Sequence, residues 1–300
     1  MVLKHLSYLA ALARERHFSR AADACHVSQA TLSEAIRRLE ADLGVPLVRR
    51  GHRFQGLTPE GERALEWAHR ILADCDGLRD DLAALREGVA GRLRLGAIPT
   101  SLPVVSRLTT PLRERHPQLR LAIRSLSSRE IERGLHEGDL DAGLTYLENE
   151  PLRGVRTLRL YAERYVLLAP SGSRWAAGET VRWRDAAQAP LCLLSDDMQH
   201  RRIVDGLFAR AGAVPRPAVE TNSISTLHAH AREARLCAVM AETWLLHGFE
   251  VPDGMSAIPL ADPSARQAIG LVWLDRDPEP ALVRALVAHA HEAAPALAAA

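Results

Sequence analysis

A heptad repeat of apolar and small side chains in residues 59–87 constrains the fold of this chain more than any other feature. Successive positions lie four and three residues apart in strict alternation. A mean period of 3.5 residues favours a helix that packs along one seam against a partner helix. Pro59 suits the first helical turn, and Gly88 and Gly91 favour its end. The seam consists of Ala64, Ala68, Ile71, Cys75, Leu78, Leu82 and Leu85.

This seam needs a partner, because a single helix cannot bury one face alone. Packing against the rest of the same chain is one way to bury it. The strict 3.5-residue period favours a second copy of the chain instead. We therefore expect self-association through Ile71, Cys75, Leu78 and Leu82.

Three short helices and a small ribbon are predicted before the seam. Apolar residues at helical spacing indicate a first helix over residues 3–16, and Ser19 suits the N-cap of a second over 20–25. Ser28 suits the N-cap of a third helix over 29–42, which Gly44 would end. Apolar residues around Gly51 and Gly56 indicate a β-ribbon over 47–58. This order of elements is that of a winged helix-turn-helix.

The third helix carries the side chains that a DNA-recognition helix needs. Short polar residues stand at its start and arginines follow along it, which suits contacts to base edges and phosphates. An ordinary three-helix bundle with solvated arginines would account for the composition alone. The candidate DNA contacts are Ser28, Gln29, Thr31, Ser33 and Arg37 on the helix, and Arg50 and Arg53 on the ribbon.

The residue pattern of this region resembles the signature of LysR-type transcriptional regulators. The shared pattern covers about sixty residues without a gap: a helix with small residues, a Val-Ser-Gln turn, a Leu-Ser pair, a basic-Leu-Glu run, a Leu-Gly pair and a Leu-Thr-x-x-Gly end. In this chain it reads Ala21-Ala22, Val27-Ser28-Gln29, Leu32-Ser33, Arg38-Leu39-Glu40, Leu43-Gly44 and Leu57-Thr58-x-x-Gly61.

Two positions depart from that signature. The family usually has proline after the glutamine, where this chain has Ala30, and often a polar or basic residue where it has Glu34. An acid near phosphate is unfavourable. Glu34 would accept a hydrogen bond from a cytosine amino group or pair with Arg37 or Arg38. We favour the intrahelical pair, and the base sequence that the helix reads stays open.

Residues 92–300 alternate between strand and helix signals, which predicts a mostly parallel α/β region. The resemblance implies a two-lobed effector domain like the periplasmic binding proteins. We expect lobe I at about 92–161 and 266–300 and lobe II at about 162–265. Residues near 146–147 would approach one crossing between the lobes, and the segment after residue 261 would form the other. The overall fold class is α/β, with a helical reader at 1–58 and a linker helix at 59–87.

The sequence contains none of the usual signals of nucleotide binding or hydrolase chemistry. GxGxxG before a helix, GxxxxGK[ST] and GxSxG are all missing, and the four cysteines form no CxxC pair. No apolar stretch approaches the roughly 20 residues of a membrane helix. We expect no catalytic residue, cofactor, metal or membrane association, and a cytoplasmic location. Peroxide-sensing members of the family carry a reactive cysteine where our alignment places Gln199, which disfavours a thiol sensor.

The effector site is expected at the carboxyl ends of strands, where helix N-termini point inward. Hydroxyls and free backbone N–H groups there suit a small molecule that carries a carboxylate or another small anion. Plain helix capping would also explain these serines. The candidate effector contacts are Thr100, Ser101, Ser127, Ser128, Gln199 and Ser223.

Two classes of function fit the sequence. The resemblance implies a homodimer that assembles to a homotetramer, reads an interrupted inverted repeat in double-stranded DNA and responds to a small molecule. The other class is a solute-binding or catalytic α/β protein with an incidental N-terminal bundle. The close match of residues 1–58 to a DNA reader favours the first.

Overall fold

The computed structural model describes residues 2–49, 54–247 and 250–298. These residues divide into two compact units. The first takes in the first four helices, through Glu87, with the short segment Gly134–Asp139, and the second takes in nearly all the rest. Within the described residues, no helix is both long and apolar enough to cross a membrane.

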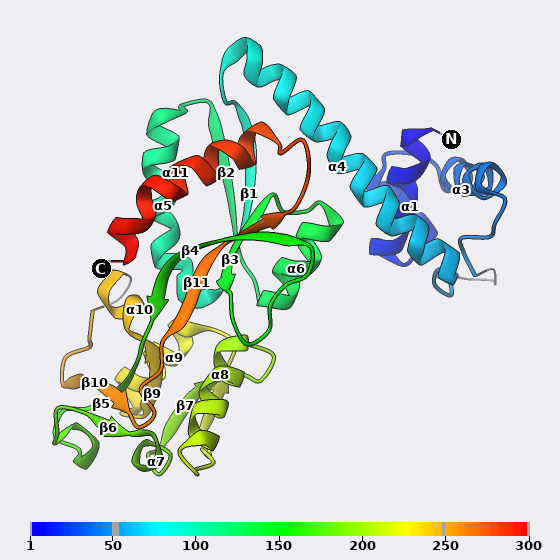
Figure 1. Ribbon diagram of the computed structural model, residues 1–300. Helices are drawn as coiled ribbons and strands as arrows, with labels where there is room; N and C mark the ends of the chain where they lie inside the picture. The colour runs from blue at the N-terminus through cyan, green and yellow to red at the C-terminus, as the bar shows by residue number, and fades with distance from the viewer. Residues whose placement is uncertain (1, 50–53, 248–249, 299–300) are drawn as a thin grey trace. The chain divides into compact units, whose positions relative to one another are not determined.

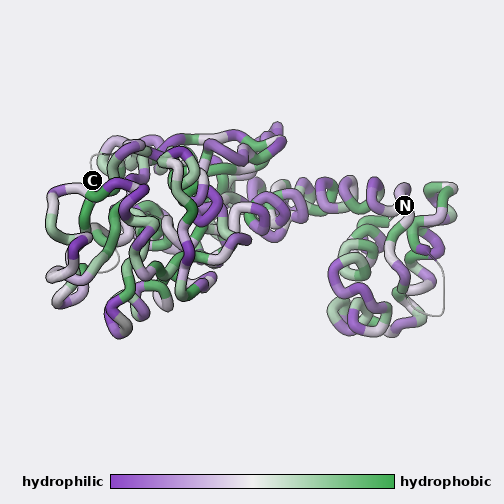
Figure 2. The backbone as a smooth tube through the Cα atoms, turned by 90° about the horizontal axis from the view of Figure 1, so that it is seen from below, coloured by the Kyte–Doolittle hydropathy of each residue, from purple (hydrophilic) through white to green (hydrophobic). Residues whose placement is uncertain are grey.

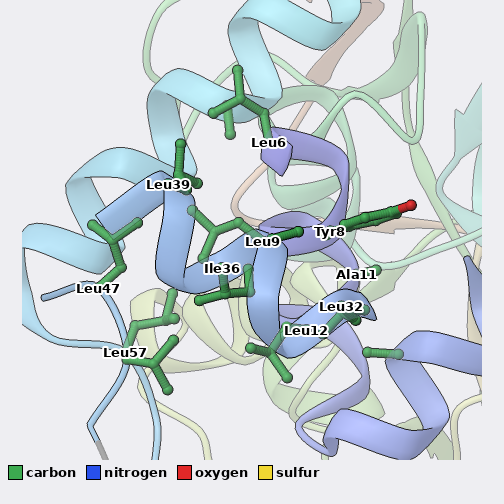
Figure 3. Close-up of a cluster of buried hydrophobic side chains, with 14 of the residues drawn as sticks. Leu6, Tyr8, Leu9, Ala11, Leu12, Leu32, Ile36, Leu39, Leu47 and Leu57 are labelled. Carbon is green, nitrogen blue, oxygen red and sulfur yellow. The ribbon is translucent and has the colours of Figure 1, made fainter. Parts of the chain in front are cut away.

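The first unit is a helical core built on α1 (Leu3–Glu15), α2 (Phe18–Ala24) and α3 (Gln29–Leu43). Figure 3 shows leucines of α1 and α3 interdigitating, and Leu9, Leu12, Leu32 and Leu39 are fully buried. The predicted start of the second helix was wrong: α2 begins at Phe18, and Ser19 lies inside it. Phe18 packs edge-to-face on Phe54, at 6.2 Å between ring centroids.

Both predicted ends of α3 are confirmed. The Ser28 hydroxyl oxygen accepts a hydrogen bond from the Thr31 backbone N–H at 3.1 Å, as an N-cap does. Gly44 ends the helix with φ of 72°, a left-handed conformation that glycine adopts at little cost. The helix therefore begins and ends where local sequence chemistry requires.

The described part of the wing, which we define as residues 47–58, pairs its two ends. An antiparallel bridge joins Val48 and Leu57, and the Arg49 N–H donates to the Gly56 carbonyl at 3.0 Å. The predicted DNA contacts Arg50 and Arg53 lie outside the described residues.

The Leu-Thr-x-x-Gly sequence ties the wing to the next helix, α4 (Pro59–Glu87). The Thr58 hydroxyl donates to the Pro46 carbonyl at 2.6 Å and accepts from the Gly61 N–H at 2.9 Å. A Cβ at Gly61 would lie 2.0 Å from the Leu47 carbonyl oxygen, so only glycine fits without a backbone shift.

The heptad seam on α4 divides into two parts. Its N-terminal part packs on the helical core, with Ala68 fully buried and Ala64 and Ile71 in contact. The C-terminal part is open: Leu78, Leu82 and Leu85 are 61%, 54% and 85% exposed. Hydrophobic positions recur along this otherwise hydrophilic long helix (Figure 2). The alternative of packing against the same chain thus accounts for the first part of the seam only.

The second unit contains two mixed sheets, which form two lobes (Figure 1). The sheet of lobe I has the order β2-β1-β3-β11-β4, and that of lobe II the order β6-β10-β5-β9-β7-β8. The strands are β1 (Gly91–Ala97), β2 (Leu119–Ser125), β3 (Ala142–Tyr146), β4 (Val155–Glu163), β5 (Tyr165–Pro170), β6 (Val181–Arg182), β7 (Leu191–Leu194), β8 (Val219–Thr221), β9 (Cys237–Ala241), β10 (Met255–Ala261) and β11 (Gln267–Leu274).

Helices cover these sheets. The short η1 (Pro99–Ser101) leads into α5 (Leu102–Arg115), and α6 (Ser128–Glu137) follows β2. The remaining helices are η2 (Arg174–Ala176), α7 (Trp183–Ala186), α8 (Gln199–Arg210), α9 (Ile224–Ala234), α10 (Glu242–His247) and α11 (Ala281–Ala298).

The prediction of a mostly parallel region was too simple. β11 runs antiparallel to β3 and β4, and β5 runs antiparallel to β9 and β10. The chain crosses from lobe I to lobe II where β4 leads into β5, and it crosses back where β10 leads into β11. The strands on either side of each crossing run opposite to at least one neighbour in the sheet, which gives the antiparallel pairs. The chain passes between the lobes at Arg164, after β4, and again between Ala261 and Gln267, near the expected lobe boundaries at 161–162 and 265–266.

Candidate DNA-reading and effector sites

Three of the predicted DNA contacts share one stripe of α3. Gln29, Ser33 and Arg37 follow each other at four-residue intervals, which places them on one face of a helix. Gln29 and Arg37 are exposed and Ser33 is half-buried at the edge of the helix face that packs on the core. We call Gln29, Ser33 and Arg37 the reading stripe. Its amide, hydroxyl and guanidinium groups are the types that read base edges.

Two other predicted contacts lie off this stripe. Thr31 is two residues from Gln29, so it projects toward another side of the helix. Its hydroxyl lies 2.8 Å from that of Ser28, within the N-cap. The Gln29 side-chain oxygen accepts a hydrogen bond from the Ser19 hydroxyl at 2.7 Å, which links α2 to the start of α3.

The preferred role of Glu34 as an intrahelical partner agrees with the structure. Its carboxylate accepts from Arg38 Nε at 3.1 Å and lies 3.9 Å from an Arg37 guanidinium nitrogen. All three side chains are more than half exposed. Water screens exposed ion pairs, so this arrangement orients the arginines more than it stabilises the fold.

A buried carboxylate that sequence reasoning missed holds the wing to α3. Glu40 is 8% exposed, and its Oε1 accepts from the backbone N–H groups of Leu47 and Val48 at 2.9 and 3.2 Å. These bonds satisfy two donors where the chain turns into the wing. The only sequence signal was the basic-Leu-Glu run, which ends on this residue.

The effector candidates meet between the two lobes of the second unit. Ten residues line a cavity of about 10 Å³, six from lobe I and four from lobe II. Thr100, Ser127 and Ser128 enter from lobe I and Gln199 from lobe II. A space of this size holds about one water, so the lobes are closed on each other here.

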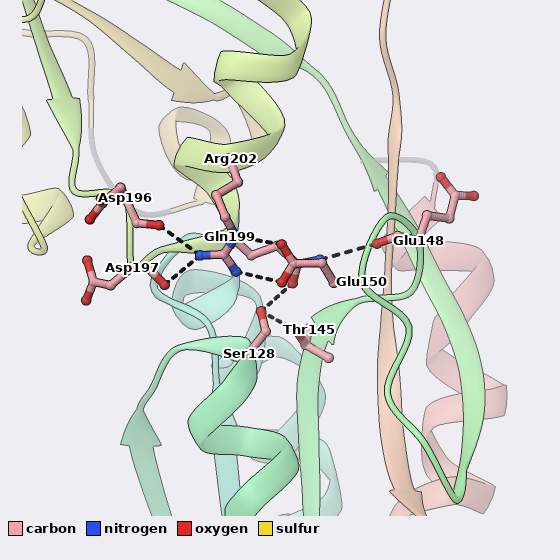
Figure 4. Close-up of polar contacts among 8 residues, drawn as sticks. All are labelled: Ser128, Thr145, Glu148, Glu150, Asp196, Asp197, Gln199 and Arg202. Carbon is pink, nitrogen blue, oxygen red and sulfur yellow. Dashed lines mark hydrogen bonds and ion pairs between the residues drawn. The ribbon is translucent and has the colours of Figure 1, made fainter.

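A cross-lobe latch, which we define as Ser128, Gln199, Glu150 and Arg202, joins the lobes (Figure 4). The Ser128 hydroxyl donates to the Gln199 side-chain oxygen and accepts from the Thr145 hydroxyl at 3.1 Å. Arg202 makes two bonds to Glu150, at 2.5 and 2.6 Å. The hydrogen bonds from Arg202 hold the pKa of Glu150 below its usual range. Separating the lobes must break these bonds.

Two predicted effector residues do not reach the cavity. Ser101 is fully buried, and its hydroxyl donates to the Ile98 carbonyl at 3.1 Å. Ser223 caps α9, where its oxygen accepts from the Thr226 N–H at 3.3 Å. The capping alternative therefore accounts for Ser223, and a local backbone bond accounts for Ser101.

Next to the cavity lies a group of buried polar residues that the sequence did not single out. Glu163 is fully buried at the end of β4, and burial raises its pKa to about 7. His200 is 6% exposed and lines the cavity, and burial lowers its pKa to about 4. Among the described residues neither side chain makes a hydrogen bond of good geometry, although the Tyr146 and Thr100 hydroxyls lie near enough to Glu163 to lower its pKa as weak hydrogen bonds do.

Metal and thiol chemistry find little support in this geometry. The described parts of the chain contain no cluster of three or more His, Cys, Asp or Glu side chains placed to hold a metal ion. Cys192 and Cys237 are buried, and burial raises the pKa of each thiol to about 11. Because Leu191 pairs with Cys237 across adjacent strands, Cys192 points to the opposite face of the sheet.

Comparison with known proteins matches both units. Residues 3–62 match the bacterial regulatory helix-turn-helix protein of the lysR family, and residues 86–295 match the LysR substrate binding domain. The chain is 31% identical over 284 residues to the DNA-binding transcriptional dual regulator OxyR of Escherichia coli K12, covering 93% of this chain and 91% of the relative. It is also 31% identical to a hydrogen peroxide-inducible genes activator of Pectobacterium carotovorum, with 93% and 92% covered.

A solved structure shows the same architecture. A full-length OxyR variant from Pseudomonas aeruginosa superimposes with a TM-score of 0.76 at 27% identity, covering 97% of this chain and 95% of that one. The likeness extends over reader, linker helix and both lobes.

Proposed function

The chain belongs to the LysR family of DNA-binding transcriptional regulators with an effector-binding domain, and from that premise we propose which of its residues read DNA and which sense the effector. We assign DNA reading to residues 1–58, linkage to 59–87 and effector binding to 92–300. Homologous chains are transcriptional regulators, and we infer that this one likewise senses its small molecule without transforming it. Its work on DNA favours a cytoplasmic location.

The observation that carries the DNA proposal is the reading stripe. Gln29, Ser33 and Arg37 present an amide, a hydroxyl and a guanidinium along one face of a helix whose opposite face is buried. A helix of this kind enters the major groove with its first residues against base edges. Arg50 and Arg53 on the wing would contact phosphates, and Ser28 and Thr31 would support the start of the helix.

Fluorescence anisotropy on DNA from upstream of the chain's own gene tests this assignment. Arg37→Ala should cost about 1–3 kcal/mol on that DNA and little on a scrambled duplex, because base contacts give sequence-dependent affinity. The control is Arg79→Ala, an exposed arginine of α4 that pairs with Asp76. Wild-type affinity in the Arg37→Ala protein would contradict the assignment.

The open part of the seam supports a homodimer. Leu78 and Leu82 are exposed in the single chain although they continue the repeat of the buried Ala68. A second α4 would cover them, and the family resemblance implies that two such dimers form a homotetramer. Leu82→Glu places a charge in that contact and should weaken association, with Arg79→Glu as an exposed control. A wild-type monomer in sedimentation at micromolar concentration would contradict it.

We place the effector between the lobes, in contact with Thr100, Ser127, Ser128 and Gln199. The supporting observation is that these four side chains, distant in sequence, line one cavity beside the latch. A molecule that enters must part the lobes, so the bound and empty forms differ in the contacts of Gln199 and Arg202. Because the two forms differ in these contacts, a ligand that binds one form shifts the population of the chain toward it.

Calorimetry against a panel of metabolite anions and zwitterions tests the placement. Thr100→Val removes a hydroxyl that lines the cavity, whereas Ser101→Ala removes a neighbouring one that does not. The first should weaken an effector found in this way by about tenfold, the worth of one hydrogen bond, and the second should not. Equal affinities in wild type and Thr100→Val would move the site elsewhere.

Oxidation of a thiol is not the signal that we propose, although relatives include peroxide-inducible activators. Gln199 stands at the start of α8, and Cys192 and Cys237 point to opposite faces of one sheet. A raised pKa keeps both thiols protonated and unreactive. Hydrogen peroxide should leave DNA binding unchanged, and a peroxide-dependent change that Cys→Ser variants abolish would contradict this.

A further inference from the structure

The inner end of the cleft holds buried polar groups whose hydrogen bonds are incomplete among the described residues. Both carboxyl oxygens of Glu163, the hydroxyls of Tyr161 and Tyr165 and both ring nitrogens of His200 lack a hydrogen-bond partner among the described residues. These residues are all at least nine-tenths buried. Buried polar atoms are nearly always hydrogen-bonded, so several unpartnered atoms in one place call for a missing partner.

Contacts connect these groups to the effector cavity. Tyr146 and His200 both line the cavity, and the Tyr146 hydroxyl lies 3.4 Å from that of Thr100, which lines it as well. The His200 ring packs edge-to-face on Tyr165, at 5.5 Å between centroids. The hydroxyls of Tyr146 and Thr100 are close enough to Glu163 to moderate the rise of its pKa. The carboxyl therefore lies directly behind the cavity wall.

The side chains at the inner end of the cleft suit a bound cation. Glu163 offers two oxygens, and no arginine, lysine or protonated histidine pairs with it among the described residues. Both arginines at the start of α8 have carboxylate partners elsewhere: Arg201 with Asp205 and Glu220, and Arg202 with Glu150. Tyrosine rings beside a carboxylate add faces that attract a cation.

We propose that the end of the cleft formed by Glu163, Tyr146, Tyr165 and His200 receives a protonated amine of the effector. This inference rests on the proposed effector site and names the class of molecule that it takes. An ammonium group has three donors, which match the two oxygens of Glu163 and a tyrosine hydroxyl. The hydroxyls of Ser127 and Ser128 line the same cavity, and they would exchange their present bonds to Glu130 and Gln199 for an acid group of the same molecule.

A proton and an amine would compete for the Glu163 carboxylate, so amine affinity should depend on pH. Glu163 titrates at about pH 7, whereas His200 is neutral above about pH 4 and the pKa values of Tyr146, Tyr161 and Tyr165 lie well above 10. Glu163 is thus the group of this cluster that changes charge between pH 6 and 8. Affinity for an amine should rise about tenfold over that range, following the ionised fraction of Glu163.

The experiment compares three probes that share one carbon skeleton: n-propylammonium, propanol and propionate. Thermal-shift titrations of the full-length protein give their affinities at pH 6 and pH 8. Carbon-13 labelling of the glutamate carboxyls gives the pKa of Glu163 with and without each probe. Glu163→Gln keeps the shape and removes the charge, and Glu114→Gln, at an exposed carboxylate of α5, is the matched control.

We expect propylammonium to bind at least about tenfold more tightly than propanol at pH 8, the worth of one charged hydrogen bond. It should also lower the pKa of Glu163, and Glu163→Gln should abolish both the preference and its pH dependence. The inference is wrong if the three probes bind equally, or if Glu163→Gln still binds propylammonium more tightly than propanol. The proposed effector site nevertheless stands in that case if Thr100→Val weakens probe binding. If no probe stabilises the protein or moves the Glu163 carboxyl signal, the inference and the site both fail.

Discussion

Glu40 in the DNA-reading unit and Glu163 between the lobes are both buried glutamates, but their surroundings differ. Glu40 accepts two backbone N–H groups at the start of the wing. Among the described residues Glu163 has only the weak contacts of the Tyr146 and Thr100 hydroxyls, and burial raises its pKa to about 7. Burying a charge is costly unless hydrogen bonds or an opposite charge compensate it. The fold supplies that compensation in the first unit and leaves it open in the second.

The difference separates a group that maintains the fold from one that is available to a ligand. Glu40 fixes where the wing leaves α3, and so it positions the reader. The side chain of Gln267, the ladder partner of Glu163, accepts a bond from Asn149 and leaves the Glu163 carboxyl to the cavity side. Unsatisfied buried groups that lie beside a cavity are the usual mark of a functional site.

Glu40→Ala should give the largest effect on stability. It leaves the buried N–H groups of Leu47 and Val48 without an acceptor, at a cost of about 3 kcal/mol in the free energy of unfolding. Urea denaturation followed by circular dichroism measures this loss. Glu40→Gln retains a side-chain oxygen and should lose less. Equal stability of wild type and Glu40→Ala would remove the distinction between the two glutamates.

Glu163→Gln should act through pH. The folded-state pKa of about 7 lies above the unfolded value of about 4.3, so Glu163 favours the folded state at low pH and this contribution is lost as pH rises toward 7. Between pH 5 and pH 8, wild type should lose about 2 kcal/mol relative to Glu163→Gln. His200 works in the opposite direction below about pH 6.5, but both proteins contain it, so their difference isolates Glu163. If the stabilities of wild type and Glu163→Gln changed with pH in parallel, the raised pKa would not belong to Glu163.

Glu34→Gln should change stability least. This carboxylate is exposed and pairs with arginines that are also exposed, and such pairs contribute less than about 0.5 kcal/mol. Anisotropy should instead show tighter binding to all DNA sequences, because Arg37 and Arg38 lose a competing partner and an acid leaves the phosphate region. A loss confined to one DNA sequence would assign Glu34 to a cytosine contact.

Sequence predicted the first unit well where the determinants are local. Ser28 and Gly44 fix the ends of α3 through their own backbone and side-chain chemistry. The start of α2 was missed because the helix begins after His17 without a side-chain N-cap that the sequence could signal. The polar residues and arginines along the predicted third helix supplied the reading stripe, but the role of Glu40 depends on the path of the wing.

The second unit was predicted in outline only. Charged residues interrupt the apolar pattern of β4, so the sequence gives no clear strand signal there, and pairing with β11 along its whole length makes it a strand. Of the effector residues, Thr100, Ser127, Ser128 and Gln199 meet at the cavity, while Ser101 and Ser223 turn to backbone groups. Nothing in the sequence separates these two sets.

A footprint of the full-length protein on DNA upstream of its own gene tests the central claim most directly. We expect protection of two half-sites of an interrupted inverted repeat, spaced by about one helical turn, because each α3 of a symmetric pair would enter the major groove. Arg37→Ala should remove this protection at protein concentrations where Arg79→Ala keeps it. Protection that is absent, or uniform along any DNA at physiological salt, would contradict the account of this chain as a sequence-reading regulator.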